Sequence, residues 1–431
     1  MVTRRFSMYD EPEFLSVIRA FQDADISFAH LEMLLHEQVT PPGKAEYTGG
    51  YMGGDPRIAD DLAWAGFNII SCAHNHAGDF GEIGMRETMR QLDRVGLMFA
   101  GIGPSLERAR EPSYLEHPRG RVALISVSSG HDPNEAAGAS TGIVPGRMGL
   151  NPLRFSTRYV VDSDSFERLQ TLSRSLSSLK PLAQPPRESL EDNEVHFLAR
   201  FARGEKVEIE TKPHPGDMEA NLRAIRDAVR QADFVIVSHH CHAPTSDPDR
   251  PATLVEEFAE ACVEAGADLY VGHGPHRDLG IRVYKGKPIF YGLGNFFAQS
   301  QFLRRIPADG YEVYGMDMDR LPTLSPADYH DIRQGILPPD YPPGAEHPLW
   351  WESTFAKMRV DEGRLTELTL HPVTLGYGNP GIERKAGIRV EGWPVLAARE
   401  NGKRILERIA RLSAQYGTRI ELEDGAGVLR L

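Results

Sequence analysis

Histidine residues in this 431-residue chain gather in three short segments. Of the 16 histidines, seven lie there: His74 and His76; His239, His240 and His242; His273 and His276. Each segment follows an apolar stretch that predicts a buried β-strand. Imidazole combined with carboxylate and amide oxygens suits Mn, Fe, Zn or Ni, and only three cysteines are present to offer thiolates instead. The pattern predicts a site for divalent transition-metal ions.

The first segment, FNIISCAHNHAGDFG at 67–81, turns from a strand into a helix. Asn75 can offer a carbonyl oxygen and His76 a ring nitrogen to a metal. Asp79 can cap the following helix or hold His76 by a hydrogen bond. Taken alone, this segment is equally well explained as a polar turn without metal ligands.

The second segment, DFVIVSHHCHAP at 233–244, places three histidines after an apolar strand. Buried imidazoles without partners are costly, so a chemical role is favoured over a solvated loop. We expect His240 to be the first ligand and His242 the second, while strand alternation turns His239 the other way.

The third segment, ADLYVGHGPHRDLG at 267–280, runs from a strand into a glycine-rich loop. Glycines let the backbone approach an ion closely, and His273 and His276 would present two ligands from one tight loop. The alternative is a glycine turn with incidental histidines. A fourth segment, SFAHLEMLLHE at 27–37, adds Glu32 as a charged oxygen donor that could bridge two ions, whereas His36 and Glu37 are predicted on a solvated helical face.

The elements that must position these side chains alternate between strand and helix, which predicts an α/β fold. Because the carboxyl ends of parallel strands meet at one edge of a sheet, the segments can converge. Strands are expected at 24–30, 67–72, 97–100, 122–127, 233–238, 268–271 and 288–293. Helices are expected at 56–64, 81–95, 219–231, 253–265 and 399–416. Residues 350–360 and 364–375 predict an antiparallel pair joined by a DEG turn.

The composition excludes several classes of protein. A net charge of −13 makes the chain a poor candidate for binding nucleic acid. No apolar run reaches the ~18–20 residues of a membrane span, and the first residues have no secretory pattern. We therefore expect a cytoplasmic protein without an anchor, and the sequence leaves its oligomeric state open.

Five motifs in order resemble the CapA family, which is named for poly-γ-glutamate capsule biosynthesis and is related in fold to calcineurin-like metallophosphatases. The motifs are HLE at 30–32, AHNH with DFG at 73–81, His240, GHGPH at 272–276 and YGLGNF at 291–296. The resemblance implies an α/β, metallophosphatase-like β-sandwich flanked by helices, with inserted irregular segments. It implies these metal-site residues: Glu32, Asn75, His76, His240, His273 and His276.

The resemblance, together with two stretches where the strand–helix pattern loosens and Pro, Ser, Gly and Asp are frequent, predicts a division of the chain. Residues 1–300 would form the CapA-like core, with an insertion at about 131–215 that partly covers it. Residues 301–348 would form an irregular, lid-like excursion. Residues 349–431 would supply strands and a helix that complete the same domain.

The chain departs from the family pattern in three places. Family members begin with a strand ending in Gly-Asp, whose aspartate is a metal ligand, and this sequence starts just past that point. We expect the shortened sheet to leave an exposed edge and an unfilled slot beside the core. His30 and His74 stand where the family usually has Asn, so either ring is a competing candidate for the replacement ligand.

The implied chemistry is hydrolysis by a hydroxide that two divalent ions activate. The substrate would be a phosphoester or a carboxyl-derived group, namely an amide, ester, lactone or γ-glutamyl bond. His74 or His242 would stabilise the developing negative charge, and Asp79 would support catalysis. Substrate contacts are predicted for three residues: Arg147, Arg154 and Asn295. Surface roles explain the two arginines equally well, and a non-catalytic accessory protein of capsule biosynthesis is the alternative to an enzyme.

Overall fold

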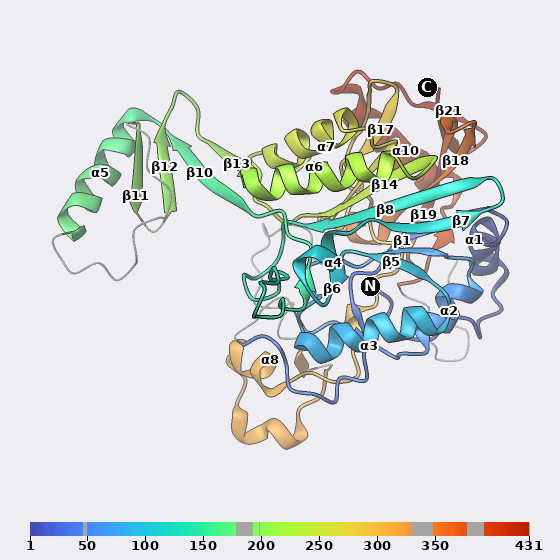
Figure 1. Ribbon diagram of the computed structural model, residues 1–431, viewed down its shortest axis with the longest axis horizontal. Coiled ribbons are helices and arrows are strands. Elements are labelled where there is room, and N and C mark those ends of the chain that lie inside the picture. The colour runs from blue at the N-terminus through green and yellow to red at the C-terminus, as the bar shows by residue number, and fades with distance from the viewer. Residues whose placement is uncertain are drawn as a thin grey trace.

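The computed structural model describes residues 1–45, 50–177, 193–197, 199–326, 328–329, 348–376 and 392–430. A six-stranded sheet with the order β16-β17-β15-β14-β8-β7 runs through the body (Figure 1). Its strands are β7 (Ser113–His117), β8 (Gly120–Ser128), β14 (Phe234–His240), β15 (Leu269–His273), β16 (Ile281–Tyr284) and β17 (Lys287–Phe290). The four inner strands are parallel, and the two edge strands are antiparallel to their neighbours.

A second, three-stranded parallel sheet has the order β1-β4-β5. Its strands are β1 (Phe28–His30), β4 (Ile69–Ser71) and β5 (Met98–Ala100). A hydrophobic cluster joins Ile69 of this sheet to Leu124 and Ile236 of the six-stranded sheet. The carboxyl ends of both sheets meet, because the Ser71 hydroxyl oxygen lies 2.7 Å from that of Ser238.

Helices cover the outer faces of both sheets (Figure 1). On the six-stranded sheet, α6 (Pro215–Val229) and α7 (Thr253–Glu264) bury Ile225 and Phe258 against inner-strand residues such as Val237. Another cluster holds the helices of the N-terminal part around the three-stranded sheet: α1 (Pro12–Gln22), α2 (Ile58–Trp64) and α3 (Gly81–Arg94). The predicted helices of these regions are confirmed, with ends shifted by a few residues.

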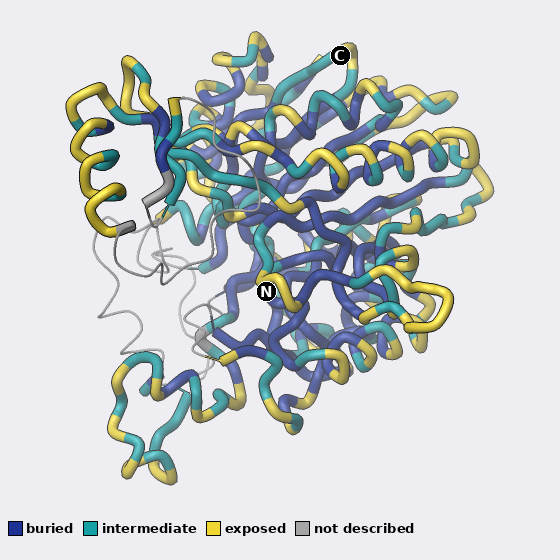
Figure 2. Tube along the Cα trace, turned by 60° about the vertical axis from the view of Figure 1, so that its left-hand side comes forward, coloured by how far each residue is buried: buried dark blue, intermediate teal, exposed yellow. Residues whose placement is uncertain are grey.

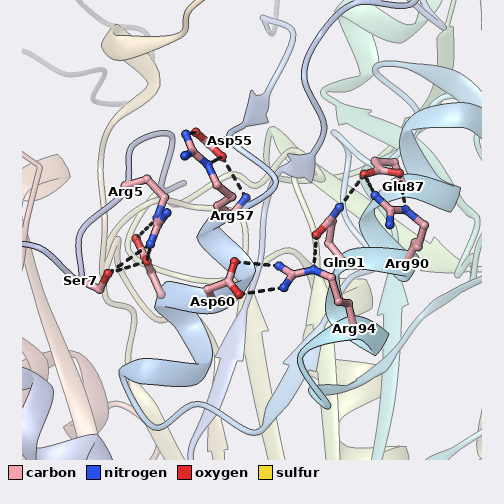
Figure 3. A network of polar contacts seen from close by, with 10 residues as sticks. Arg5, Ser7, Asp55, Arg57, Asp60, Glu87, Arg90, Gln91 and Arg94 are labelled. Carbon is pink, nitrogen blue, oxygen red and sulfur yellow. Dashed lines mark hydrogen bonds and ion pairs between the residues drawn. The ribbon is translucent and has the colours of Figure 1, made fainter.

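Ion pairs tie the N-terminal helices together at the surface (Figure 3). The Arg94 guanidinium of α3 donates to both carboxylate oxygens of Asp60 in α2, at 2.8 and 2.7 Å. Arg5 donates to Asp61, which is fully buried. These contacts fix α2 against α3 and hold the start of the chain beside them.

The C-terminal part forms a third sheet around a long hairpin. As predicted, β18 (Glu352–Asp361) and β19 (Arg364–Thr374) pair antiparallel. β19 also pairs with β20 (Val395–Leu396) and β22 (Ala426–Leu429), and β22 pairs with β21 (Glu421–Glu423). Helix α10 (Arg399–Ala414) packs Ile405 and Ile409 into the cluster between the first two sheets. Among the described helices, none combines the length and the apolar character that crossing a membrane requires.

The region at 131–215 contains more regular structure than the sequence pattern predicts. Figure 1 shows a projecting arm, and Figure 2 shows that its helix α5 is exposed along one side. The arm consists of β10 (Phe155–Val161), α5 (Ser163–Ser177), β11 (Glu194–Phe197), β12 (Ala199–Arg203) and β13 (Glu208–Pro213). Its strands escape a search for apolar runs because they are half-exposed and joined by cross-strand ion pairs, such as Arg158 with Glu210.

Short elements complete the described part of the chain. Two strand pairs are β2 (Leu34–Leu35) with β3 (Gly53–Gly54), and β6 (Ile102–Gly103) with β9 (Gly149–Leu150). The remaining helices are α4 (Leu106–Arg110), α8 (Ala308–Val313) and three 3₁₀ turns at Ser300–Phe302, Met318–Thr323 and Pro348–Trp351. Part of the segment predicted as an irregular lid, 301–348, is thus helical, and residues 330–347 of it lie outside the described ranges.

The prediction of a solvated helix around His36 is wrong. His36 directly follows β2 and is only 4% exposed. Its Nδ1 atom accepts the Gln38 backbone N–H at 3.0 Å, and its ring packs on Phe80. Leu34 and Leu35 of β2 are buried in the core. Their burial outweighs the polar character of His36, which follows them directly.

A cavity of about 770 Å³ lies between two strand edges. Within the described residues, β1 pairs only with β4, and β18 pairs only with β19. Both β1 and β18 line the cavity, which extends over Phe234 and Leu269 and reaches His273. This geometry agrees with the expectation of an exposed edge beside an unfilled slot. Met1 and Val2 also line this cavity.

We expect that extending the chain before Met1 by a short apolar strand ending in Gly-Asp raises the Tm by roughly 5 °C or more. The added strand would fill the cavity and pair two open edges. Differential scanning calorimetry compares the two forms. An extension of the same length made of Gly and Ser serves as the control, and equal Tm values for all three forms would contradict this expectation.

Candidate metal centre

Glu32 lies at the centre of the histidine cluster, two residues beyond the end of β1. The residue is 6% exposed, and its Oε1 atom is buried without a hydrogen-bond partner. In the described part of the chain, no lysine or arginine forms an ion pair with this carboxylate. A buried carboxylate without compensation is costly, so the position calls for positive charge.

Three imidazole rings turn their Nε2 atoms toward Glu32 Oε1. The distances are 3.6 Å from His276, 3.9 Å from His240 and 3.9 Å from His242. These separations are too long for hydrogen bonds. Two ligands that share one ion can be this far apart, because each metal–ligand bond measures about 2.0–2.2 Å.

Two groups of three side chains could each hold an ion, and Glu32 belongs to both. One group is His30, Glu32 and His240, and the other is Glu32, His242 and His276. In each group the ligand atoms lie within 4.8 Å of one another. A carboxylate shared by two adjacent groups is the arrangement expected of a bridging ligand.

Several buried ligand-type atoms have no partner in the protein. They are Glu32 Oε1, Asn75 Oδ1, His240 Nε2 and His273 Nε2. Buried polar atoms are normally hydrogen-bonded, so these unpaired ligand-type atoms need an explanation. A bound cation supplies one, and the residues therefore fit the metal that the sequence implies.

The AHNH turn is held from behind by a buried charge network. Asp79 Oδ2 lies 2.7 Å from His76 Nδ1 and accepts the Met52 backbone N–H at 2.7 Å. The Lys44 ammonium lies 3.1 Å from Asp79 Oδ1 and 2.9 Å from Glu135 Oε1. Burial by itself would lower the pKa of Lys44, but the two carboxylates raise it above its ordinary value. Asp79 is thereby fixed as the partner of His76 Nδ1.

The GHGPH loop is strained in a way that serves the site. Gly274 has φ +119°, and a Cβ there would collide with the Cys241 carbonyl. His276 adopts φ +54°, a left-handed conformation that is uncommon for residues other than glycine. Its Nδ1 atom lies 2.9 Å from Asn295 Oδ1, and Asn295 in turn donates to the Trp350 carbonyl at 3.0 Å. Asn295, predicted to bind substrate, is thus engaged in orienting His276.

His30, which stands where the family usually has Asn, lies in the cluster and contacts other side chains through both ring nitrogens. His30 Nε2 lies 3.0 Å from His240 Nδ1, and His30 Nδ1 lies 2.9 Å from the Ser71 hydroxyl. The other departure, His74, is 1% exposed, and its Nδ1 accepts the His76 backbone N–H at 3.1 Å. The neutral His74 ring therefore carries its proton on Nε2 and is a hydrogen-bond donor.

His239 turns away from the cluster, as strand alternation predicts. Its two ring nitrogens contact Ser129 and the Tyr270 hydroxyl at 2.7 and 2.6 Å, on the face that packs against α7. His239 is a satisfied core residue.

The two predicted substrate arginines are occupied elsewhere. Arg154 forms a two-pronged ion pair with Asp217 at 2.6 and 2.9 Å. Arg147 donates twice to the Ala136 carbonyl. None of these contacts involves the histidine cluster, so the structure does not bring the two arginines to Glu32. The sequence around the two arginines is apolar and glycine-rich, and it does not indicate that Asp217 and the Ala136 carbonyl are their partners.

Sequence reasoning missed Lys44, Glu135 and Ser71. Lys44 and Glu135 have 3% and 1% of their side chains exposed, which is unusual for charged residues. Nothing in the local pattern marks either one, because each is buried by loops that meet only in the folded chain. Ser71 lies in an apolar strand. Its hydroxyl, the one polar group in that strand, was the only feature of the sequence that could have indicated a role.

Burial lowers the pKa of His74 and His273 to about 3 and that of His276 to about 4, which keeps these three rings neutral at neutral pH. The site thus combines one carboxylate with neutral nitrogen ligands.

Comparison with known proteins places these features in a family. Residues 6–300 match the family model described as "Bacterial capsule synthesis protein PGA_cap", which is more than half of the chain. An uncharacterized protein of Sinorhizobium fredii, y4sH, is 36% identical over 441 aligned residues, covering 100% of this chain and 91% of the relative.

Two further relatives match about half of the chain. The PGA biosynthesis protein CapA of Bacillus subtilis is 45% identical over 231 residues, which cover 53% of this chain and 42% of the relative. A probable polyglutamine synthesis accessory protein of Mycobacterium tuberculosis is 23% identical over 228 residues, covering 53% of this chain and 44% of the relative. Each of these two matches covers less than half of the relative's own length.

We expect Asp79→Asn to weaken Mn²⁺ binding about 10- to 100-fold, the usual effect of losing a partner that orients a ligand. The amide cannot compensate the Lys44 charge and orients His76 poorly. Isothermal titration calorimetry measures the affinity. Asp60→Asn, which removes a surface ion pair, is the matched control, and similar affinities for both variants would contradict the assignment.

Affinity for the ion held on the His240 and His273 side of Glu32 should stay nearly constant from about pH 8 down to about pH 5.5. Protons compete for a ligand only near or below its pKa, and burial lowers the pKa of His273 to about 3 and that of His240 well below its ordinary value. Imidazoles with an ordinary pKa of about 6.5 would lose affinity across this range. A tenfold or greater loss of affinity between these two pH values would show that the rings titrate normally.

Proposed function

Because this chain belongs to the bacterial capsule synthesis protein PGA_cap family, we propose that it is a metal-dependent hydrolase with a two-ion centre built around Glu32. The single observation that carries the proposal is the shared position of Glu32 in two adjacent groups of ligand-type side chains. The mixed α/β body, with its two layers of sheet and outer helices, fits a metallophosphatase-like sandwich, the fold we propose with it.

The ligands divide into two sets around the shared carboxylate. Glu32, His242 and His276 would hold one ion. Glu32 and His240 would hold the other, with Asn75, His76 and His273 contributing. The ligand atoms of Asn75 and His273 are buried and have no hydrogen-bond partner. Both sets combine carboxylate or amide oxygen with imidazole nitrogen, which suits Mn, Fe, Zn or Ni.

A bound pair of divalent ions would supply a water nucleophile activated at neutral pH and a Lewis acid for the attacked group. The chain's own residues would do the rest. His74 carries its donor proton on Nε2, so it can donate to an oxygen that gains negative charge. His242, with 35% of its side chain exposed, is the cluster member most accessible to an incoming substrate.

The substrate class follows from what the centre can polarise. A phosphoester and a carboxyl-derived group (an amide, ester, lactone or γ-glutamyl bond) both develop negative charge on oxygen during attack. The names of the Bacillus and Mycobacterium relatives, which refer to PGA and polyglutamine, favour a γ-glutamyl substrate. The net charge of −13 opposes binding a long polyanion over the whole surface, so recognition would be local.

An accessory role without catalysis is the second candidate. It is favoured by the Mycobacterium relative, which is named an accessory protein, and by the departures at His30 and His74. In that case the chain would keep a metal for structure or for binding a γ-glutamyl chain, and no bond would be cleaved.

Turnover by the metal-reconstituted protein separates the two candidates. The test substrates are a chromogenic phosphodiester and a short γ-glutamyl peptide, each incubated with Mn²⁺, Zn²⁺, Fe²⁺ or Ni²⁺. We expect hydrolysis of at least one substrate that is lost in Glu32→Gln and reduced about 100-fold or more in His74→Ala. His117→Ala, whose ring makes a local contact on β7, is the control. Metal binding without any turnover would favour the accessory role, and failure to bind metal would exclude both versions of the centre.

A further inference from the structure

His30 is enclosed by other members of the cluster. Its ring stacks on the His273 ring with 4.2 Å between the ring centroids and an interplanar angle of 10°. The centroid of the His240 ring lies 5.0 Å away. Both ring nitrogens have short contacts, Nε2 with His240 Nδ1 at 3.0 Å and Nδ1 with the Ser71 hydroxyl at 2.9 Å. Neither nitrogen is left for another partner without breaking one of these contacts.

Only one proton can lie between His30 Nε2 and His240 Nδ1, and two arrangements are possible. If His30 donates, His240 Nδ1 accepts. The proton of the neutral His240 ring then lies on its Nε2 atom, which has no hydrogen-bond partner. If His240 donates from Nδ1, its Nε2 carries a lone pair that faces Glu32 Oε1 at 3.9 Å. The first arrangement points the Nε2–H group at the Glu32 carboxylate and leaves no lone pair there for a metal, whereas the second presents two acceptors to one cation.

The rest of the cluster follows the second arrangement. His76 Nδ1 faces Asp79, and His276 Nδ1 faces Asn295. A carboxylate and an amide oxygen can only accept, so both rings carry a proton on Nδ1. His240 has no oxygen acceptor at Nδ1, and His30 occupies that place.

We infer that His30 is a positioning residue that accepts a hydrogen bond from His240 Nδ1 and so holds the His240 Nε2 lone pair toward Glu32. The proton of His30 is then on Nδ1 and is donated to Ser71 Oγ, whose own hydroxyl can donate to Ser238 at 2.7 Å. His30 is therefore not itself a ligand, although it lies close enough to Glu32 and His240 to be grouped with them. The inference deepens the proposed function, and its consequence for metal binding rests on that proposal.

The protonation of His240 can be measured directly in the protein with an excess of Zn²⁺, a diamagnetic ion, present. Long-range ¹H–¹⁵N spectra of protein labelled with ¹⁵N-histidine distinguish rings protonated on Nδ1 from rings protonated on Nε2. Comparison with His240→Gln assigns the His240 signals. We expect His240 to be protonated on Nδ1. A His240 ring protonated on Nε2 would overturn the inference whether or not the protein binds metal.

Variants of His30 then test the consequence for metal binding. His30→Gln can keep an acceptor oxygen near the position of Nε2, whereas His30→Leu removes it at similar bulk. We expect Mn²⁺ affinity to fall about 10- to 100-fold in His30→Leu and to be largely retained in His30→Gln. Circular dichroism and Tm confirm that both variants fold, and the wild-type spectra decide the matter if one does not.

Each outcome separates the inference from the proposed function. Unchanged affinity in a folded His30→Leu protein would overturn the positioning role while leaving the metal centre in place. If no form binds Mn²⁺, the proposed function fails, and the protonation of His240 still tests the hydrogen bond to His30.

Discussion

Glu32 places a negative charge in the interior of the protein, and the arrangement around it follows from that constraint. A buried carboxylate must be compensated, and the described residues supply no lysine or arginine as an ion-pair partner. Instead they surround it with imidazoles, whose protons are directed away toward Asp79, Asn295 and, as we infer, His30. Neutral nitrogen lone pairs around one carboxylate are a poor environment for an anion alone and a good one for a cation. This arrangement supports our proposal that the cluster binds metal.

The two parallel sheets bring these residues together. The strands β1, β4, β14 and β15 end at His30, Ser71, His240 and His273, and hydroxyl contacts between Ser71 and Ser238 hold the two sheets in register at that end. Residues more than 200 positions apart in the chain thus become neighbours. The loops that follow the strands carry the more exposed members, His242 and His276. A rigid inner set and a more accessible outer set suit a centre that must hold ions and also admit a substrate.

Much of this could be predicted from the sequence, because the relevant signals are local. Apolar runs followed by histidines identified the strands and the positions of Glu32, His240 and His276, and strand alternation correctly turned His239 away. The strands of the projecting arm were missed because they depend on ion pairs such as Arg158 with Glu210 and not on apolar runs. Lys44 and Glu135 were missed because their partners come from separate loops. Arg147 and Arg154 were predicted near the substrate because their charge is visible in the sequence, whereas their internal partners are not.

The central claim is that Glu32 is shared by two metal ions. Crystals of the protein grown with Mn²⁺, with diffraction recorded at an energy where manganese scatters anomalously, test it most directly. The account predicts two anomalous peaks, both within bonding distance of the Glu32 carboxylate, with His276 and His242 beside one and His240 beside the other. A protein saturated with Mn²⁺ that shows no peak at Glu32, or peaks only at surface carboxylates, would contradict it.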